Sequence, residues 1–153
     1  MRKITYAAPC VRPDFIPKGR PRGTKAQGLA YERALARALP KASHGQWFHY
    51  VEQLGPGWCQ TDLLLESKNK IVIIEAKLTN YDEALVKLMD LYIPVVRVAY
   101  PEKDVHAVIA LRHVTNVPKD REIFDRLDAA LVESADAVTP PVFHWLGKGP
   151  VWG

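Results

Sequence analysis

The sequence contains little cysteine and no long apolar run. Its two cysteines, Cys10 and Cys59, belong to no CxxC or Cys/His spacing, so we expect neither a disulfide framework nor a zinc site. No stretch approaches the roughly 20 apolar residues of a membrane span, and residues 1–10 lack the hydrophobic region of a signal peptide. We therefore expect a protein of the reducing cytoplasm with no membrane partner.

Acidic residues are scarce near the N-terminus. Residues 1–25 contain one acid, Asp14, and seven basic side chains, whereas the rest of the chain contains 16 acidic and 14 basic ones. A basic segment before a nearly neutral body predicts a polyanionic partner, because each Lys or Arg that neutralises a phosphate releases counterions. A disordered, solubilising tail is the alternative interpretation of this segment.

Composition divides the 153 residues into three parts. Prolines and glycines are frequent in residues 1–23, which makes a helix there unlikely to form and predicts a basic flexible arm. Residues 24–135 are expected to form one globular domain, since the chain is 48% hydrophobic and long enough to bury a core. Residues 136–153, which contain Trp145 and Trp152, are expected to form an irregular C-terminal tail.

Periodicity and turn residues predict the order of helices and strands in the domain. The first helix is expected over residues 24–39, with Thr24 as its N-cap and Pro40 as its stop. A second helix is expected over residues 80–92, ended by Pro94. Strands are expected at residues 46–54, 59–67, 70–78, 95–100 and 106–114, with a turn at residues 55–57 and a last helix at residues 119–132. This order predicts an α/β domain with a mixed central sheet flanked by helices.

Three acidic residues interrupt apolar patterns. Glu32 lies on the apolar stripe of the first helix, three residues after Leu29 and three before Leu35. Asp62 and Glu75 each lie on an otherwise apolar face of a predicted strand, because side chains alternate between the two faces of a strand. A charge in such a place needs a partner, and Lys77 shares the face of Glu75.

The short polar segment at residues 67–70 fixes the register between these two strands. A two-residue loop at Lys68 and Asn69, or a four-residue loop over residues 67–70, would place Asp62 directly opposite Glu75, with Cβ atoms about 5 Å apart. Two carboxylates this close repel each other, so a positive charge is expected between them. Lys77 is one candidate, and a divalent cation is the other; oxygen ligands suit magnesium or manganese.

Two carboxylates and a lysine in this arrangement could catalyse a reaction at phosphorus. A cation held by Asp62 and Glu75 could bind a phosphate oxygen and activate water, while Lys77 would stabilise charge that develops during attack on phosphorus. Glu32 would complete the metal shell or hold Lys77 in place. The alternative is an ordinary charge cluster on an exposed sheet face, with Glu32 tolerated at a helix edge.

These motifs resemble those of the PD-(D/E)XK nuclease superfamily. The segments "KAQGLAYERALARAL", "QTDLLLE" and "IVIIEAKL" are most similar to small resolvase-like and phage-encoded members, over residues 24–100. The resemblance implies a restriction-endonuclease-like αβββαβ core and a metal-dependent phosphodiesterase, with Asp62, Glu75 and Lys77 in the signature positions and Glu32 as the helix glutamate. Thr61 replaces the usual proline. Many members carry a glutamine in the next helix, where this chain has Lys87 on the solvated face and Tyr81 as the nearer polar group.

The basic arm adds a second resemblance. "PKGRPRG" at residues 17–23 is similar to an AT-hook core, which lies extended in the minor groove of A·T-rich DNA. Minor-groove contact, general phosphate contact and no direct role all remain open. Contacts to the DNA backbone are expected from four basic side chains. They are Lys18, Arg20, Arg22 and Lys25.

The function expected from these patterns is a magnesium-dependent or manganese-dependent DNA endonuclease. Structure-selective cleavage of branched DNA is favoured, because a chain this short has little room for a separate sequence-reading module. The resemblance also implies a phage-encoded protein that acts in the host cytoplasm, and a homodimer joined through residues 106–114 or the last helix. The alternatives are a non-catalytic DNA-binding or scaffolding protein on the same fold, and an exonuclease or RNA-directed nuclease. His49 could face the site, although a core or surface histidine is the more ordinary interpretation.

Overall fold

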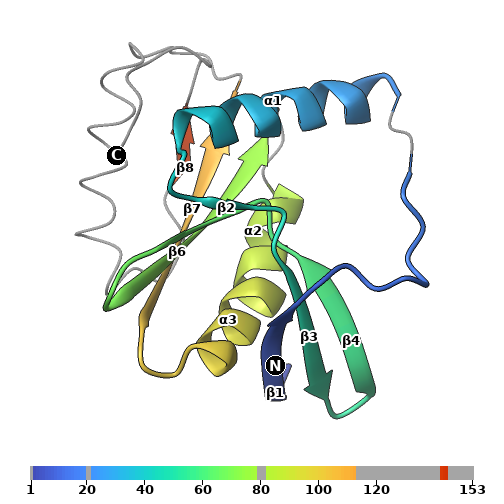
Figure 1. Ribbon diagram of the computed structural model, residues 1–153, viewed down its shortest axis with the longest axis vertical. Helices are drawn as coiled ribbons and strands as arrows, with labels where there is room; N and C mark the ends of the chain where they lie inside the picture. Colours follow the sequence, from blue (N-terminus) through green and yellow to red (C-terminus); the bar gives the residue numbers. More distant parts are fainter. Residues whose placement is uncertain (1, 20–21, 79–81, 113–141, 145–153) are drawn as a thin grey trace.

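The computed structural model describes residues 2–19, 22–78, 82–112 and 142–144. They form a mixed α/β structure with two sheets, which confirms the predicted α/β class (Figure 1). The strand order is β1-β3-β4 in the three-stranded sheet and β2-β5-β6-β7-β8 in the five-stranded sheet. The strands are β1 (Ile4–Cys10), β2 (Ser43–His44), β3 (Trp47–Glu52), β4 (Gly55–Gln60), β5 (Leu63–Glu66), β6 (Lys70–Lys77), β7 (Asp104–Leu111) and β8 (Val142–His144). The helices are α1 (Thr24–Ala38), α2 (Asp82–Lys87), the π-helical segment η1 (Leu88–Tyr92) and α3 (Ile93–Ala99).

The N-terminal region corrects one prediction. Residues 4–10, expected to belong to a flexible arm, form β1 and pair antiparallel with β3. Pro9 does not prevent this, because β1 is an edge strand and an edge strand can lack a backbone donor. Ala7 is buried in the core of the small sheet, so the ordered structure begins well before Thr24.

The region between β3 and β5 also differs from expectation. Residues 55–57 were predicted to form a turn, but they begin β4, and the hairpin closes through the preceding two residues, since Glu52 pairs with Gly55. The strand predicted at residues 59–67 is divided between two sheets, with β4 ending at Gln60 and β5 beginning at Leu63. The backbone N–H of Thr61 donates to the carbonyl of Gln46 at 2.9 Å and holds this bend.

The hairpin of β5 and β6 has the predicted register. Leu63 pairs with Ile74 and Glu66 with Ile71, and the backbone N–H of Ser67 donates to the carbonyl of Lys70 across a two-residue loop. Extending this ladder by one residue places Asp62 beside Glu75, as the sequence predicts.

Strand β6 is central to the large sheet. It pairs antiparallel with β5 and parallel with β7, which confirms the strand predicted at residues 106–114 apart from its exact ends. Ile71 and Ile73 pack in the core that includes α3, while Val72 and Ile74 pack in the core beneath α1. Both faces of β6 are therefore covered. Its polar C-terminal end, with Glu75 and Lys77, does not lie on an open sheet face.

The helical region after β6 is longer than predicted. Residues 82–99 form one run of helix, so Pro94 does not end it and residues 95–100 are not a strand. The π-helical turn explains this difference: Ile93 N–H donates to the carbonyl of Leu88, five residues back, which accommodates the missing N–H and the ring of Pro94. Val95 and Val96 are fully buried in this helix.

Helix α1 confirms the first predicted helix, which ends one residue before the expected Leu39. Gly23, with φ 59°, holds the N-cap position instead of Thr24. The buried positions are Tyr31, Leu35 and Leu39, whereas Leu29 is only partly buried. In the ranges that the structure describes, no helix is long and apolar enough to cross a membrane. The helix predicted at residues 119–132 lies outside these ranges, and β8 lies within the tail that was expected to be irregular.

Candidate functional site

The four residues singled out by sequence line one pocket. It has a volume of about 450 Å³ and lies among α1, the carboxyl end of β6 and the helical run that follows. Glu32 comes from α1, Asp62 from the residue before β5, and Glu75 and Lys77 from β6. The fold therefore brings together the four residues that the sequence predicts to act together.

Asp62 and Glu75 are locked to each other through the backbone. Ala76 N–H donates to Asp62 Oδ2 at 2.8 Å, and Asp62 N–H donates to Glu75 Oε1 at 3.3 Å. The two hydrogen bonds continue the β5–β6 ladder beyond its last backbone pair. This exchange fixes both carboxyl groups at the open end of the hairpin.

Glu75 is the most buried of these acids, with a relative exposure of 5%. Its pKa is raised well above the ordinary value of 4.5, chiefly by burial and then by the charge of Asp62, while Lys77 acts in the opposite direction. A carboxyl group in this environment ionises easily only if positive charge is supplied nearby.

Glu32 completes the acidic group from the helix side. Its Oε2 lies 3.1 Å from Nε2 of His44. Burial, a side-chain hydrogen bond to Asp62 and the charge of Asp62 raise the pKa of Glu32 to about 9, whereas Arg33 and Lys77 lower it. Glu32 thus belongs to the same electrostatic group as the two strand acids.

His44 is a neighbour of Glu32 that the sequence did not predict. His44 belongs to the two-residue strand β2, where it pairs with Leu63, the residue after Asp62. A strand this short leaves no periodic pattern in the sequence, so no sequence signal identified it. The position of His49 is also settled: its ring contacts Tyr6 and Trp58 on the small sheet and does not line the pocket.

Three further polar residues of the pocket come from the helices. Tyr92 lies in η1, and its pKa is raised by burial and by the charges of Glu75 and Asp62. Lys87 is exposed, as predicted, but it lines the pocket as well. Lys25, predicted to contact nucleic acid, lines the pocket from the first turn of α1. Lys25, Lys77 and Lys87 therefore place positive charge around the acids.

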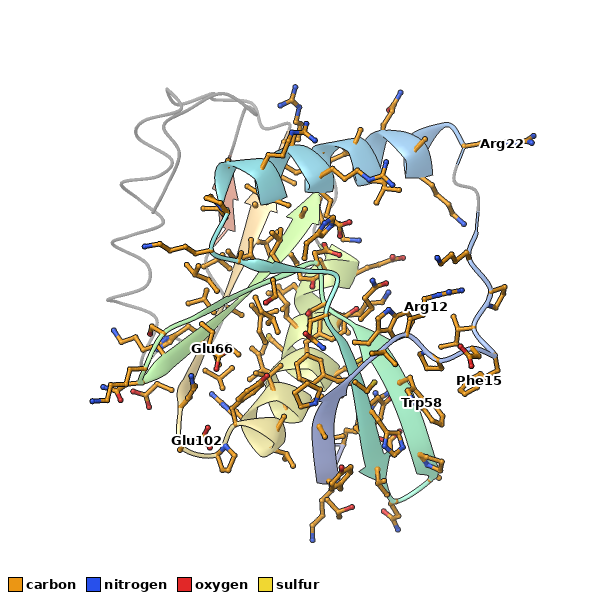
Figure 2. All side chains as sticks on the ribbon, viewed as in Figure 1. Arg12, Phe15, Arg22, Trp58, Glu66 and Glu102 are labelled. Atoms are coloured by element: carbon orange, nitrogen blue, oxygen red, sulfur yellow. The ribbon has the colours of Figure 1, made fainter. Side chains whose placement is uncertain are left out.

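Two other predicted nucleic-acid contacts, Lys18 and Arg22, do not line the pocket. Lys18 and Arg22 are exposed in the segment between β1 and α1, and Figure 2 shows Arg22 extending from the start of α1 into solvent. Arg20 and Tyr81 lie outside the described residues. The segment thus presents cations without an ion-pair partner for Lys18 or Arg22 among the described residues.

The three acids are of the chemical type that binds a divalent cation, but each already accepts or shares a hydrogen bond within the site. Three carboxyl groups provide hard oxygen donors of the kind that magnesium and manganese prefer, and their mutual repulsion favours an added positive charge. However, among the described residues no group of three or more His, Cys, Asp or Glu side chains is arranged to hold a metal ion. Each of the three acids has an oxygen committed to the hydrogen bonds given above.

Comparison with known proteins adds little to this geometry. No protein-family model and no curated protein matches the chain. Among solved structures, the crystal structure of protein VC1899 from Vibrio cholerae is similar at 14% sequence identity and a TM-score of 0.41, over 74% of this chain. The similar part covers 28% of that chain, so this chain spans less than a third of its neighbour's length. A likeness this weak supports no argument about fold or activity.

Proposed function

We propose that the protein is a divalent-metal-dependent nuclease of the PD-(D/E)XK type, with a restriction-endonuclease-like core, that hydrolyses phosphodiester bonds in DNA. The observation that carries the proposal is the reciprocal hydrogen bonding of Asp62 and Glu75 in a pocket that also contains Glu32 and Lys77. In a purely structural cluster, the acids and bases would need only to neutralise one another. Here the acids and lysines line an open pocket that could admit a phosphate.

Asp62, Glu75 and Glu32 would hold the cation. When bound, it would supply Lewis-acid polarisation of a phosphate oxygen. The Lys77 ammonium group would offset negative charge that develops on the phosphoryl oxygens during in-line attack by water. Lys25 and Lys87 would bind phosphates on either side of the scissile bond and hold the strand in place.

The preference for DNA with branches or junctions remains part of the proposal. The exposed cations Lys18 and Arg22 and the pocket residue Lys25 would contact backbone phosphates, which favours shape over base sequence. A homodimer would cut two strands symmetrically, as the resemblance implies.

A second candidate is a non-catalytic nucleic-acid-binding protein on the same fold. The hydrogen bonds that occupy Glu32, Asp62 and Glu75 favour it, since carboxylates used in this way stabilise the fold without any cation. An exonuclease or an RNA-directed nuclease would use the same chemistry as the first candidate.

The two candidates differ in their response to metal. The protein is incubated with supercoiled plasmid, linear duplex, a four-way junction and a single-stranded RNA, each with magnesium, manganese or EDTA. Cleavage of plasmid or junction with a cation, and none with EDTA, supports the nuclease. Binding of all substrates without cleavage under any condition supports the second candidate and contradicts the first.

A further inference from the structure

The outer face of the three-stranded sheet carries exposed aromatic rings. On its inner face, Phe48, Tyr50 and Cys59 are buried, and Phe48 contacts Tyr100 just beyond α3. Because side chains alternate along a strand, residues next to these point the other way. The outward positions hold His49 and Trp58, which are only partly buried, and Tyr6, which is 51% exposed.

These rings contact one another in a row. The ring of Tyr6 lies 5.9 Å from that of His49, and His49 lies 4.8 Å from Trp58. Phe15, which is 68% exposed, reaches Trp58 from the segment after β1 at 4.9 Å (Figure 2). We call Tyr6, Phe15, His49 and Trp58 the aromatic surface. It is assembled from three separate parts of the chain.

Exposed apolar groups concentrate on this part of the molecule. Among the described residues, six large apolar side chains are exposed. Four of them belong to β1, the segment after it or the β3–β4 hairpin: Tyr6, Val11, Phe15 and Leu54. Exposed and partly buried rings that contact one another, as Tyr6, His49, Trp58 and Phe15 do, form the kind of contiguous patch that marks an interaction site.

The charges around the aromatic surface are mainly positive. Residues 2–18 and 47–60, which build this unit, contain four basic side chains and two acids. One of the acids, Glu52, is already paired with Arg2 at 3.2 Å. Lys3 and Lys18 are exposed, and Arg12 lies on the same side of the molecule as Phe15 and Trp58 (Figure 2).

The segment after β1 links this surface to the pocket. It connects the end of β1 to the start of α1, and Figure 1 shows residues 11–19 of it on one side of the molecule. Arg12, Lys18 and Arg22 lie on this segment, and Lys25 of α1 lines the pocket. Along the chain, these basic residues therefore lie between the aromatic surface and the pocket.

We propose that the aromatic surface binds unpaired bases of a single-stranded nucleic-acid segment, whose phosphates follow Arg12, Lys18, Arg22 and Lys25 toward the pocket. Aromatic rings stack on any base, and flanking cations follow the backbone, so this combination suits single strands and is not selective for sequence. In a base-paired duplex the faces of the bases are covered by stacking. The inference takes from the proposed function only that the partner is nucleic acid.

Fluorescence anisotropy of a labelled oligothymidine of about 20 nucleotides tests this inference in EDTA, where cleavage does not contribute. Phe15→Ala and Trp58→Ala should each weaken binding about tenfold, and Trp58→Phe should retain most of the affinity. Val86→Ala, which truncates an exposed apolar side chain on α2, is the matched control and should bind normally. Binding of a blunt duplex should change little in any of these variants.

The salt dependence of oligothymidine binding distinguishes the contribution of base stacking from that of charge. Between about 50 and 200 mM salt, the slope of log affinity against log salt should be unchanged in Phe15→Ala and shallower in Lys18→Ala. Phe15 is the decisive position, because its exposed side chain can be removed without disturbing the core.

If the affinity for oligothymidine is unchanged in both Phe15→Ala and Trp58→Ala, the inference is overturned, and the aromatic surface would instead bind a protein. Equal losses for duplex and single strand would overturn it as well. Failure of the proposed function is a separate result: a protein that binds oligothymidine through this surface but cleaves nothing with magnesium would retain the inference and lose the nuclease.

Discussion

The Asp62 and Glu75 side chains each accept a hydrogen bond from the backbone beside the other. Ala76 N–H donates to Asp62 Oδ2 at 2.8 Å, and Asp62 N–H donates to Glu75 Oε1 at 3.3 Å. The hairpin therefore uses the two acids to extend its own ladder, and the charge of Asp62 is one cause of the raised pKa of Glu75.

The metal-free protein should lose stability as the pH rises. The pKa of Glu32 is about 9 in the folded protein and 4.5 in the unfolded chain, and the pKa of Glu75 shifts in the same direction. Between these values the folded state binds more protons than the unfolded state, so the free energy of unfolding falls from about pH 4.5 toward pH 9. Urea unfolding in EDTA at several pH values measures this slope.

The matched variants for this measurement are Glu32→Gln and Glu75→Gln. Each removes one of the groups that titrate, so each should give a flatter dependence on pH than the unsubstituted protein. If the free energy of unfolding depends on pH as steeply in both variants as in the unsubstituted protein, other groups control the pH dependence.

Divalent cations should stabilise the protein at pH 8. A cation that binds only the folded state adds about 2.7 kcal/mol to the free energy of unfolding at a hundredfold excess over its Kd. Thermal unfolding with increasing magnesium should therefore shift the Tm upward, and Asp62→Ala should reduce the shift. An equal shift in Asp62→Ala would place the cation somewhere else on the protein.

The two cysteines should differ in reactivity. Burial, followed by the nearby Cys10 and Glu75, raises the pKa of the Cys59 thiol to about 12, and Cys59 is buried whereas Cys10 is partly exposed. With a thiol reagent at pH 8, one thiol should react in the native protein and both in guanidinium chloride. Cys10→Ser should remove the native reaction; a reaction that survives in Cys10→Ser would show that Cys59 is accessible.

Two glycines should respond to alanine in opposite ways. A Cβ at Gly57 would overlap the ring of Tyr50 on the buried face of the small sheet, so Gly57→Ala should destabilise by about 1–3 kcal/mol. Gly28 lies inside α1 with open space around its Cα, and Gly28→Ala should stabilise by about 0.5–1 kcal/mol. Urea denaturation measures both; destabilisation by Gly28→Ala would contradict the helix geometry.

The hairpin register and the inward position of Glu32 could be predicted from the sequence because both follow from fixed periods. The two-residue loop at Lys68 and Asn69 permits one register, and a period of 3.6 residues places Glu32 between Leu29 and Leu35. Such local rules need no knowledge of the rest of the chain.

Features decided by tertiary packing could not be predicted in this way. The short apolar run at residues 95–100 fits a buried helix as well as a strand, and only the π-helical turn before Pro94 makes the helix feasible. Strand β1 is hidden in a proline-rich, basic sequence, and its pairing with β3 makes it a strand. His44 reaches Glu32 from a strand of two residues, which has no period to detect.

Cleavage assays of Asp62→Asn and Lys77→Ala test whether the pocket around these two residues cleaves nucleic acid. With supercoiled plasmid and magnesium, both variants should lose at least about a hundredfold in rate, because Asp62→Asn weakens the proposed cation site and Lys77→Ala removes the ammonium group proposed to offset charge on the reacting phosphate. Both should still bind oligothymidine in EDTA with little loss of affinity. Plasmid cleavage at the unsubstituted rate in both variants would contradict the account and move the active site to another part of the protein.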